Sequence, residues 1–401
     1  MLEQVEIYPG DPILSLMEDY QKDPRAEKVN LSIGFYYDEN GNVPVLESVK
    51  KAKVLLDARP QEPNLYLPMD GLPSFRERTQ EYLFGELDGA YAERIATIQT
   101  VGGSGAIRVG ADFLKRYYPD SQVWVSDPTW DNHHAIFKGA GFDVQRYQYL
   151  KEGGQEIDFQ GMIDTFDSLP ENTVVLLHAC CHNPTGLDLR PTQWNVLFSV
   201  CAHRKLIPFL DAAYLGMGDG LAEDCYAIRV LASVGITSLV SNSFSKVFSL
   251  YGERVGSLSI ICESSAIAER VGGQLKGTVR TNYSNPPRFG AELVGIILSD
   301  RSLKTAWLAE LEGMRQRIVD MRRALYDAIK TLKPSADVEY LIKQKGMFSF
   351  SGLAPEAVDR IRENHGIYFI RNGRICMAGL NGSNLTKVAS AIASESHARS
   401  A

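Results

Sequence analysis

The sequence predicts an α/β fold, in which a large domain built on an open, mostly parallel sheet is joined to a smaller α+β domain. Three observations predict it. Short apolar runs rich in β-forming residues recur through the middle of the chain, and helical patterns separate several of them. Beyond residue 301 the pattern changes to long amphipathic helical segments. Such an alternation is typical of a parallel sheet covered by helices.

The predicted strands of the large domain are short, apolar runs, most of which end in small or polar residues. They are Ile95–Val101, Val123–Ser126, Thr173–His178, Leu206–Leu210, Ser238–Val240 and Gly256–Cys262. In the small domain, strand patterns fall at Val29–Ile33, Met347–Phe350 and Ile375–Ala378. We therefore expect an N-terminal arm over residues 1–12, a small domain over residues 13–43 and 311–401, and a large domain over residues 44–310.

Length, composition and charge exclude several classes of protein. The chain has 401 residues, of which 44% are hydrophobic and 23% charged, as in ordinary globular proteins. Its formal charge of −7 (42 − 49) and the absence of basic clusters argue against nucleic acid and anionic membranes as partners. The acidic N-terminus does not resemble a signal peptide. The six cysteines lack metal-ligand spacing, so we expect reduced thiols of a cytoplasmic protein and no metal site.

Lys246 closes the segment Ser243–Lys246, which follows the predicted strand Ser238–Val240, and Arg254 lies eight residues further on. A lysine at a strand end, among hydroxyl groups and near a fixed cation, has surroundings in which a lowered pKa would favour imine formation with an aldehyde. Taken alone, the segment also fits an ordinary solvated lysine. The residues at the neighbouring strand ends therefore have to be considered before Lys246 is interpreted as a cofactor-binding or an ordinary solvated lysine.

Two further strand ends carry polar side chains that suit an aromatic cofactor. The run Leu206–Leu210 ends in Asp211, with Tyr214 three residues on, and a carboxylate there can pair with a pyridinium nitrogen. The turn His182–Gly186 follows another strand, and the amide of Asn183 can hydrogen-bond a ring hydroxyl. Each has an ordinary structural explanation as well, since Asp211 can be a helix N-cap and the turn can simply end its strand.

The glycine-rich turn Gly102–Gly105 follows a predicted strand and opens a predicted helix. Glycines let backbone N–H groups approach a phosphate at a helix N-terminus, where the helix dipole favours an anion. Ser243, Ser245 and Arg254 would complete such a site with hydroxyl groups and a cation. A dinucleotide site is disfavoured, because Arg108 stands where the third glycine of the Gly-x-Gly-x-x-Gly pattern would fall.

Five more side chains are candidates on weaker grounds. Trp130 follows a strand and either stacks on a planar cofactor or belongs to the core. His133 and His178 either orient Asp211 or a cofactor ring, or are core histidines. Arg374, before a strand of the small domain, and Arg280, in a predicted polar loop, either grip substrate carboxylates or are surface arginines.

Taken together, these segments resemble the aspartate/aromatic aminotransferases along nearly the whole chain, and most closely the bacterial tyrosine (aromatic-amino-acid) aminotransferases. The stretches that carry the resemblance are Val29–Glu39, Tyr66–Leu72, Gln99–Gly105, Val123–His133, His178–Gly186, Ser241–Arg254 and Asn282–Pro287. The resemblance implies the fold of the type I pyridoxal-phosphate transferases, with a seven-stranded sheet in the large domain. It also implies pyridoxal 5′-phosphate as cofactor and a homodimer with shared active sites.

The resemblance implies roles for the matching residues of the large domain. Lys246 matches the lysine that binds the cofactor and then moves the substrate proton, and Asp211 matches the partner of the ring nitrogen. Asn183 and Tyr214 match the groups that hold the ring hydroxyl, and Trp130 matches the tryptophan that stacks on the ring. The residues that match the phosphate cradle are Gly103, Ser104, Ser243, Ser245 and Arg254, together with Tyr66, which would reach the phosphate of the neighbouring subunit.

The remaining matches concern the substrate. Arg374 matches the arginine that binds the α-carboxylate, and Arg280 matches one that enters the partner's site to meet a side-chain carboxylate. Gly34 matches a small-domain glycine beside the substrate, where Trp130 and Asn183 also contribute. The implied reaction is a ping-pong transamination between an aromatic amino acid (tyrosine, phenylalanine) or aspartate and 2-oxoglutarate.

Three alternatives stay open. The chain can be mainly an aspartate aminotransferase, because the sequence does not rank tyrosine, phenylalanine and aspartate. The same cofactor can serve decarboxylation or elimination, although Arg374 argues against decarboxylation by holding the α-carboxylate in the ring plane. A non-catalytic, cofactor-binding regulator is the third, and no segment resembles a DNA-binding module that would support it.

Overall fold

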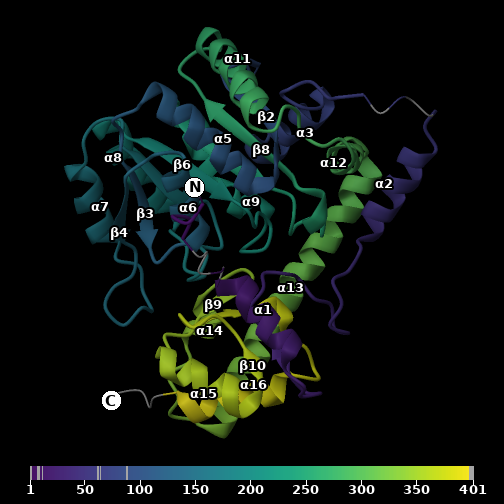
Figure 1. Ribbon diagram of the computed structural model, residues 1–401, viewed down its shortest axis with the longest axis vertical. Helices are drawn as coiled ribbons and strands as arrows, with labels where there is room; N and C mark the ends of the chain where they lie inside the picture. Colours follow the sequence, from purple (N-terminus) through teal and green to yellow (C-terminus); the bar gives the residue numbers. More distant parts are fainter. Residues whose placement is uncertain are drawn as a thin grey trace. The chain divides into compact units, whose positions relative to one another are not determined.

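The computed structural model describes residues 2–6, 10, 12–60, 63, 65–86 and 89–396 (Figure 1). The chain divides into two compact units. We call residues 44–316 the large unit and residues 1–43 with 317–401 the small unit. Helix α13 (Arg301–Leu332) carries the chain from one to the other. Of the predicted N-terminal arm, residues 1, 7–9 and 11 lie outside the described residues.

The large unit is built on a seven-stranded sheet in the order β2-β8-β7-β6-β5-β3-β4. Its strands are β2 (Ile95–Val101), β3 (Val123–Asp127), β4 (Val144–Gln148), β5 (Val174–His178), β6 (Ile207–Ala212), β7 (Ser238–Ser243) and β8 (Val255–Ile261). All pairs from β7 to β4 are parallel, whereas β8 runs antiparallel to both of its neighbours. The predicted mostly parallel sheet is confirmed.

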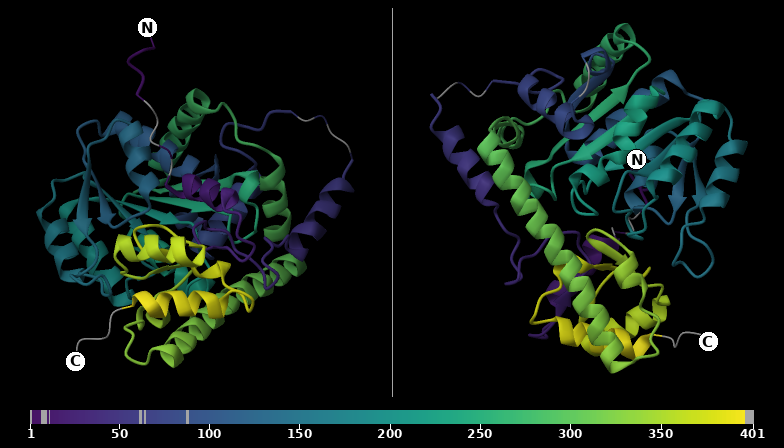
Figure 2. Two further views of the ribbon diagram at one scale, coloured as in Figure 1. Left: turned by 60° about the horizontal axis from the view of Figure 1, so that its bottom comes forward. Right: turned by 180° about the vertical axis from the view of Figure 1, so that it is seen from behind.

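Helices lie against this sheet in all the views (Figures 1 and 2). Those of the large unit, besides the first part of α13, are α2 (Glu47–Asp57), α3 (Pro73–Phe84), α4 (Gly89–Ala92), α5 (Gly102–Tyr117), α6 (Asp131–Gly139), α7 (Phe159–Ser168), α8 (Pro191–Arg204), α9 (Leu221–Asp224), α10 (Tyr226–Val234), α11 (Ser265–Asn282) and α12 (Phe289–Ser299). Every residue of β5 to β8 is buried. Strands covered on both faces tend to be nearly continuous apolar runs, and β5, with the sequence Val-Val-Leu-Leu-His, is the clearest example here.

Helix α5 approaches the sheet closely. It packs on β7 and β8, and a Cβ atom added at Gly110 would lie only 2.7 Å from the ring of Phe209. A helix can come this near only where it presents a hydrogen instead of a side chain. The N-terminus of α5 is thereby held over the ends of β7 and β8, where the candidate residues gather.

The small unit combines short strand pairs with helices. Its elements, besides the end of α13, are α1 (Pro12–Lys22), β1 (Val29–Asn30), α14 (Tyr340–Lys343), β9 (Phe348–Phe350), α15 (Pro355–His365), β10 (Ile367–Tyr368), β11 (Arg374–Cys376) and α16 (Leu385–Glu395). Strand β1 pairs in parallel with β10, and β9 pairs antiparallel with β11. The α+β character predicted for this part is confirmed. None of the described helices is long and apolar enough to span a bilayer.

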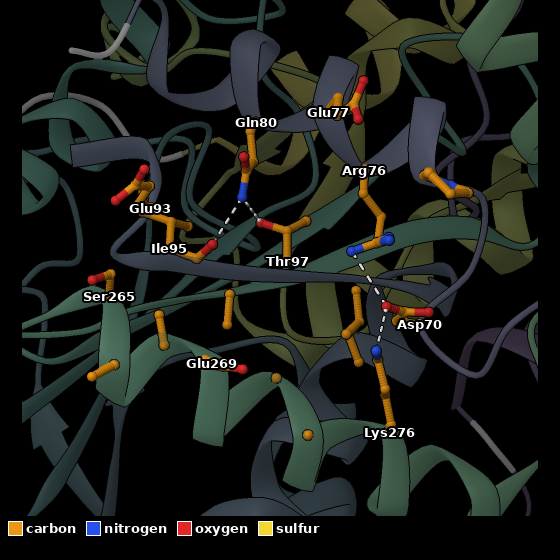
Figure 3. Close-up of a pocket in the computed structure, with 17 residues that line it drawn as sticks. Asp70, Arg76, Glu77, Gln80, Glu93, Ile95, Thr97, Ser265, Glu269 and Lys276 are labelled. Carbon is orange, nitrogen blue, oxygen red and sulfur yellow. Dashed lines mark hydrogen bonds and ion pairs between the residues drawn. The ribbon is translucent and has the colours of Figure 1, made fainter. Parts of the chain in front are cut away.

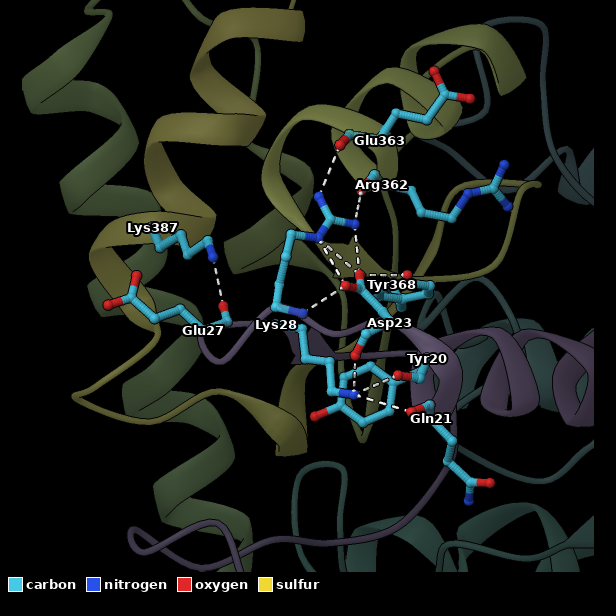
Figure 4. A network of polar contacts seen from close by, with 10 residues as sticks. Tyr20, Gln21, Asp23, Glu27, Lys28, Arg362, Glu363, Tyr368 and Lys387 are labelled. Carbon is cyan, nitrogen blue, oxygen red and sulfur yellow. Dashed lines mark hydrogen bonds and ion pairs between the residues drawn. The ribbon is translucent and has the colours of Figure 1, made fainter.

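A polar network ties the start of the chain to α15 and β10 (Figure 4). The carboxylate of Asp23 accepts hydrogen bonds from Arg25 and from the hydroxyl of Tyr368, at 2.7 Å for the latter. Arg25 also donates to the main-chain carbonyls of Arg362 and Glu363, at the end of α15. Backbone carbonyls at a helix C-terminus lack helical partners, so a cation there stabilises the helix end. The N-terminal segment is in this way part of the small unit.

Candidate active site

The candidate residues of the large unit converge where β5, β6 and β7 end. In the register of these parallel strands, His178 pairs with Asp211 and Asp211 pairs with Ser241. Asn183, Tyr214 and Lys246 lie on the segments that directly follow β5, β6 and β7. Ligands of open α/β sheets bind beyond such carboxyl ends, so the sheet topology itself brings these side chains together.

Asp211 is buried and lies inside β6, so it is not a helix N-cap. One carboxylate oxygen lies 3.2 Å from Nε2 of His133, and the other accepts a hydrogen bond of 3.0 Å from the hydroxyl of Ser241. Burial acts to raise the pKa of Asp211, but the hydrogen bonds and the neighbouring histidines outweigh it and lower that pKa. The carboxylate is therefore ionised and fixed on both oxygens. Ser241 was not among the residues predicted from the sequence, although it lies on the same face of β7 as Ser243.

A row of buried histidines continues from Asp211. The rings of His133 and His178 lie 5.1 Å apart, and those of His178 and His182 lie 4.2 Å apart. Burial lowers the pKa of His178 to about 3 and the pKa of His182 well below its ordinary value. Both rings are therefore neutral at neutral pH. Nδ1 of His133 lies 2.8 Å from the hydroxyl of Thr129, which limits how the ring can turn.

Lys246 is half-buried, which distinguishes it from a solvated surface lysine. Its Nζ lies 4.9 Å from the centre of the Tyr214 ring. The residues around it are packed firmly: Phe248 is fully buried and stacks on Trp307, whose indole N–H donates a hydrogen bond of 2.8 Å to the carbonyl of Val247. The core thus holds the main chain next to Lys246, and the amine of Lys246 lies beside the Tyr214 ring.

The glycine-rich turn meets the serines and the arginine. Gly102 has φ +65°, and a Cβ atom there would come within 2.6 Å of the guanidinium of Arg254. At Gly103 an added Cβ would lie 3.1 Å from Cβ of Ser243. Arg254 donates hydrogen bonds to Ser245 Oγ (3.3 Å) and to the carbonyl of Tyr251 (3.1 Å). A cradle is therefore formed by the first turn of α5, with Ser104, together with Ser243, Ser245 and Arg254. An oxyanion in it would meet N–H groups, hydroxyls and a cation.

Trp130 and Asn183 complete this part of the site. Asn183 is buried after β5, and Trp130 is half-buried at the start of α6. The Trp130 ring meets the ring of His133 edge-on, at 5.2 Å between centres. Trp130 is therefore only partly in the core, and its stacking on a cofactor stays a prediction.

Two further residues of the large unit are exposed. Tyr66 has 92% of its surface exposed, which is unusual for an aromatic side chain. Arg280 is exposed and donates a hydrogen bond to the hydroxyl of Ser284. The expectation that Arg280 lies in a polar loop is wrong. It lies in the last turn of α11, because the buried residues Leu275 and Val279 continue the helical spacing to that point.

Gly34 and Arg374 lie in the small unit. Arg374 is only 5% exposed, so it is not a surface arginine. Its guanidinium lies 4.3 Å from the centre of the Phe348 ring and donates a hydrogen bond of 2.7 Å to the carbonyl of Ser32. At Gly34 an added Cβ would lie 2.8 Å from the same Phe348 ring. Phe348 therefore packs against Arg374 and limits the space at Gly34, and no sequence pattern had singled it out.

A cavity of about 800 Å³ opens elsewhere in the large unit, between α3, β2 and α11 (Figure 3). Asp70 forms ion pairs there with Arg76 (3.3 Å) and Lys276 (3.1 Å). Gln80 donates hydrogen bonds to the carbonyl of Ile95 and to the hydroxyl of Thr97. Gln80 joins α3 to the edge strand β2, and Asp70 joins α11 to the segment before α3, so these polar groups serve the fold.

Comparison with known proteins agrees with this geometry. Residues 26–392 match the family model of the class I and II aminotransferases. The tyrosine aminotransferase of Klebsiella pneumoniae and the aromatic-amino-acid aminotransferase of Escherichia coli (strain K12) are each 54% identical to 98% of the chain and to 99% of their own length. An aspartate aminotransferase of Pseudomonas aeruginosa is 45% identical over 98% of both chains. A solved aromatic-amino-acid aminotransferase from Burkholderia pseudomallei, covalently bound to pyridoxal phosphate, has a TM-score of 0.96 at 44% identity and covers 99% of this chain and 100% of its own.

Proposed function

Since the chain belongs to the class I and II aminotransferase family, we propose that it transfers the amino group of an aromatic amino acid, tyrosine or phenylalanine, or of aspartate to 2-oxoglutarate. The observation that carries the aromatic substrates is the 54% identity to enzymes named for tyrosine and for aromatic amino acids. The identity to an aspartate aminotransferase is lower, at 45%. A mainly aspartate-specific enzyme is the alternative.

Pyridoxal 5′-phosphate is the cofactor of this family, and the residues present fit it. When bound, it supplies an aldehyde that combines with amines and a protonated ring that withdraws electrons from the substrate carbon. The fit rests on the cradle, which a Cβ atom at Gly102 or Gly103 would fill. Gly103, Ser104, Ser243, Ser245 and Arg254 would hold the phosphate there.

At the ring end of the site, Asp211 would accept a hydrogen bond from the ring nitrogen and keep its proton in place. His133 and Ser241, which fix the two carboxylate oxygens, prevent Asp211 from turning away. Asn183 and Tyr214 would donate hydrogen bonds to the ring hydroxyl. Because these groups are buried, the interactions are stronger than they would be in water.

Lys246 would act as the base that takes the proton from Cα of the substrate and returns it to the cofactor carbon that carried the aldehyde. Its position just after β7, half-buried and with Nζ 4.9 Å from the centre of the Tyr214 ring, supports this role. Trp130 would cover the ring. Arg374 would bind the α-carboxylate of the substrate, with Gly34 leaving room beside it.

We further propose that two chains share each active site. Tyr66 and Arg280 are both exposed, as residues that act in a neighbouring subunit have to be. Tyr66 would reach the phosphate held by the partner, and Arg280 would meet the second carboxylate of aspartate or 2-oxoglutarate. When the substrate is aromatic, Arg280 would have to turn aside.

The cytoplasm is the proposed compartment. All six cysteines are buried and free, which suits a reducing environment.

The experiment that tests the proposed substrates compares kcat/KM for tyrosine, phenylalanine and aspartate, with 2-oxoglutarate as the acceptor. We expect all three to be used, with the aromatic substrates at least equal to aspartate. A strong preference for aspartate would favour the alternative. Carbon dioxide or ammonia as the main product would contradict transamination altogether.

A further inference from the structure

Two imidazoles and a carboxylate meet in the large unit, and the proposed catalysis gives a role to Asp211 and His133 but none to His178. His133, His178 and Asp211 each offer one ligand atom, and the three atoms lie within 4.8 Å of one another. All three residues are buried. The sequence suggests no metal site here, because the sheet brings together positions that are far apart in the chain. Two histidines with one carboxylate are a ligand set of zinc-class ions.

His178 is the residue whose state most needs an explanation. Its Nε2 is buried and has no hydrogen-bond partner within the described part of the chain. A buried ring nitrogen without a partner is rare, because it loses its bonds to water and gains nothing in return. A neutral imidazole carries a lone pair on one ring nitrogen, and His178 offers one ligand atom to the group formed with His133 and Asp211. The neutral state is the one in which histidine binds a metal ion.

The geometry around His133 fits the same interpretation. Its Nε2 lies 3.2 Å from the nearer oxygen of Asp211. Two ligands that each lie about 2.0–2.1 Å from a tetrahedral ion are about 3.3 Å apart. The other ring nitrogen of His133 bonds to Thr129 at 2.8 Å, and Ser241 bonds to the other oxygen of Asp211. Such outer partners orient metal ligands and fix the histidine tautomer.

We infer that the cofactor-free chain binds one transition-metal ion of the zinc class through Nε2 of His133, Nε2 of His178 and a carboxylate oxygen of Asp211. A water molecule takes the fourth position. The ion and the cofactor exclude each other, because both require the carboxylate of Asp211; this clause alone rests on the proposed function. A zinc-class ion therefore opposes loading of the cofactor.

A second cluster, Cys180, Cys181 and Asp224, serves as a comparison. The carboxylate of Asp224 already accepts hydrogen bonds of 2.8 to 3.0 Å from three backbone N–H groups within residues 216–219. The hydrogen bond to Cys181 and burial raise the pKa of the Cys180 thiol well above its ordinary value. That cluster organises a loop, whereas the histidine cluster leaves a nitrogen without a partner.

The test is a calorimetric titration of the untagged, full-length, cofactor-free chain with zinc chloride, and with magnesium chloride as the comparison. We expect one zinc ion per chain and no binding of magnesium, since nitrogen-rich sites prefer zinc, nickel and copper to magnesium. His178→Gln and His178→Ala should each weaken zinc binding at least tenfold. The control is His203→Gln, on the exposed face of α8, which should leave zinc binding unchanged.

Thermal unfolding of each variant shows whether weaker zinc binding comes from the lost histidine or from a lost fold. The comparison of magnesium with zinc is made on the unaltered chain and therefore does not depend on any variant folding. Zinc binding by His178→Gln as tight as by the unaltered chain, or no stoichiometric binding at all, would overturn the inference. Titration of the zinc-loaded chain with pyridoxal phosphate is the last arm. Unhindered loading of the zinc-loaded chain contradicts mutual exclusion. Failure of the zinc-free chain to bind pyridoxal phosphate contradicts the proposed function instead.

Discussion

At the scale of single residues, the carboxylate of Asp211 is the group on which the proposed chemistry depends most. Asp211→Asn keeps the size of the side chain but replaces the charge that would hold a proton on the ring nitrogen. We expect kcat/KM with tyrosine to fall by about 10²–10³-fold, as when a preorganised charge interaction is removed. Steady-state kinetics measure this loss.

Asp211→Glu is the matched control, because it retains the charge at a changed reach. It should recover part of the activity that Asp211→Asn loses. Equal activity of Asp211→Asn and the unaltered enzyme would exclude the proposed role.

His178 should make the stability of the fold depend on pH. Burial lowers the pKa of His178 to about 3, with His133 lowering it further and Asp211 opposing the shift, whereas an unfolded histidine titrates near 6.5. Between these values the unfolded chain binds a proton that the folded chain does not. The free energy of unfolding therefore falls as the pH falls, by about 1.4 kcal/mol per pH unit from this residue.

His178→Gln should remove that share of the slope, and urea unfolding at several values between about pH 6.5 and about pH 4 measures it. The exposed His203→Gln is the control and should keep the slope. An unchanged slope for His178→Gln would show that His178 is already protonated in the folded chain.

The sequence predicted which residues are candidates better than it predicted which residues they contact. Asp211 and Lys246 stand at strand ends in the sequence, but the contact of Asp211 with Ser241 depends on the register between β6 and β7, which no sequence pattern states. For the same reason the sequence did not predict which residues His133 contacts. The burial of Arg374 beside Phe348 depends on the pairing of β9 with β11.

At the scale of elements, the turn from β2 into α5 is the part most sensitive to substitution. Gly102→Ala would place a side chain at φ +65°, within 2.6 Å of the Arg254 guanidinium. We expect a loss of about 1 kcal/mol of stability from the backbone strain. We also expect at least tenfold weaker cofactor binding, since Arg254 must move. Thermal unfolding and a cofactor titration measure the two effects.

Gly313→Ala is the control for this substitution. Gly313 lies inside α13, and an added Cβ there has no neighbour within 4 Å. Alanine should stabilise the helix by about 0.5–1 kcal/mol and leave cofactor binding unchanged. A Gly102→Ala protein that behaved like Gly313→Ala would contradict the close fit of the cradle.

The elements also show where sequence patterns fail. The strands β5, β6 and β8 were predictable because they are buried throughout and mostly apolar. Strand β7 is also buried, but four of its six residues are polar, and only Ser238–Val240 was predicted. Strand β4 lies at the sheet edge with only Tyr147 buried, and its sequence Val-Gln-Arg-Tyr-Gln gives little apolar signal. Strand β1 stops at Asn30, because the side chain of Asn30 accepts a hydrogen bond from the N–H of Ser32 and turns the chain.

At the scale of the whole molecule, shared active sites make a specific prediction for mixed dimers. In a dimer of one Lys246→Ala chain and one Arg280→Ala chain, one site carries both changes and the other carries neither. Each variant alone should be nearly inactive with aspartate and 2-oxoglutarate. Co-expression should restore about a quarter of the normal activity, because half of the dimers are mixed and each has one intact site.

Differently tagged chains allow the mixed dimer to be purified and assayed. Co-expression of two Lys246→Ala chains with the same two tags is the control and should stay inactive. If the purified mixed dimer were as inactive as its parents, Arg280 would act within its own chain or not at all.

The central claim is that Lys246 and its neighbours perform a transamination in two separate halves. A single measurement tests it most directly: the purified, cofactor-loaded protein is mixed with excess tyrosine and no oxo acid, and the 2-oxo acid formed is counted. We expect one equivalent per chain and then no more, until 2-oxoglutarate is added and turnover begins. Continued formation of product without an acceptor, or no product at all, would contradict the account.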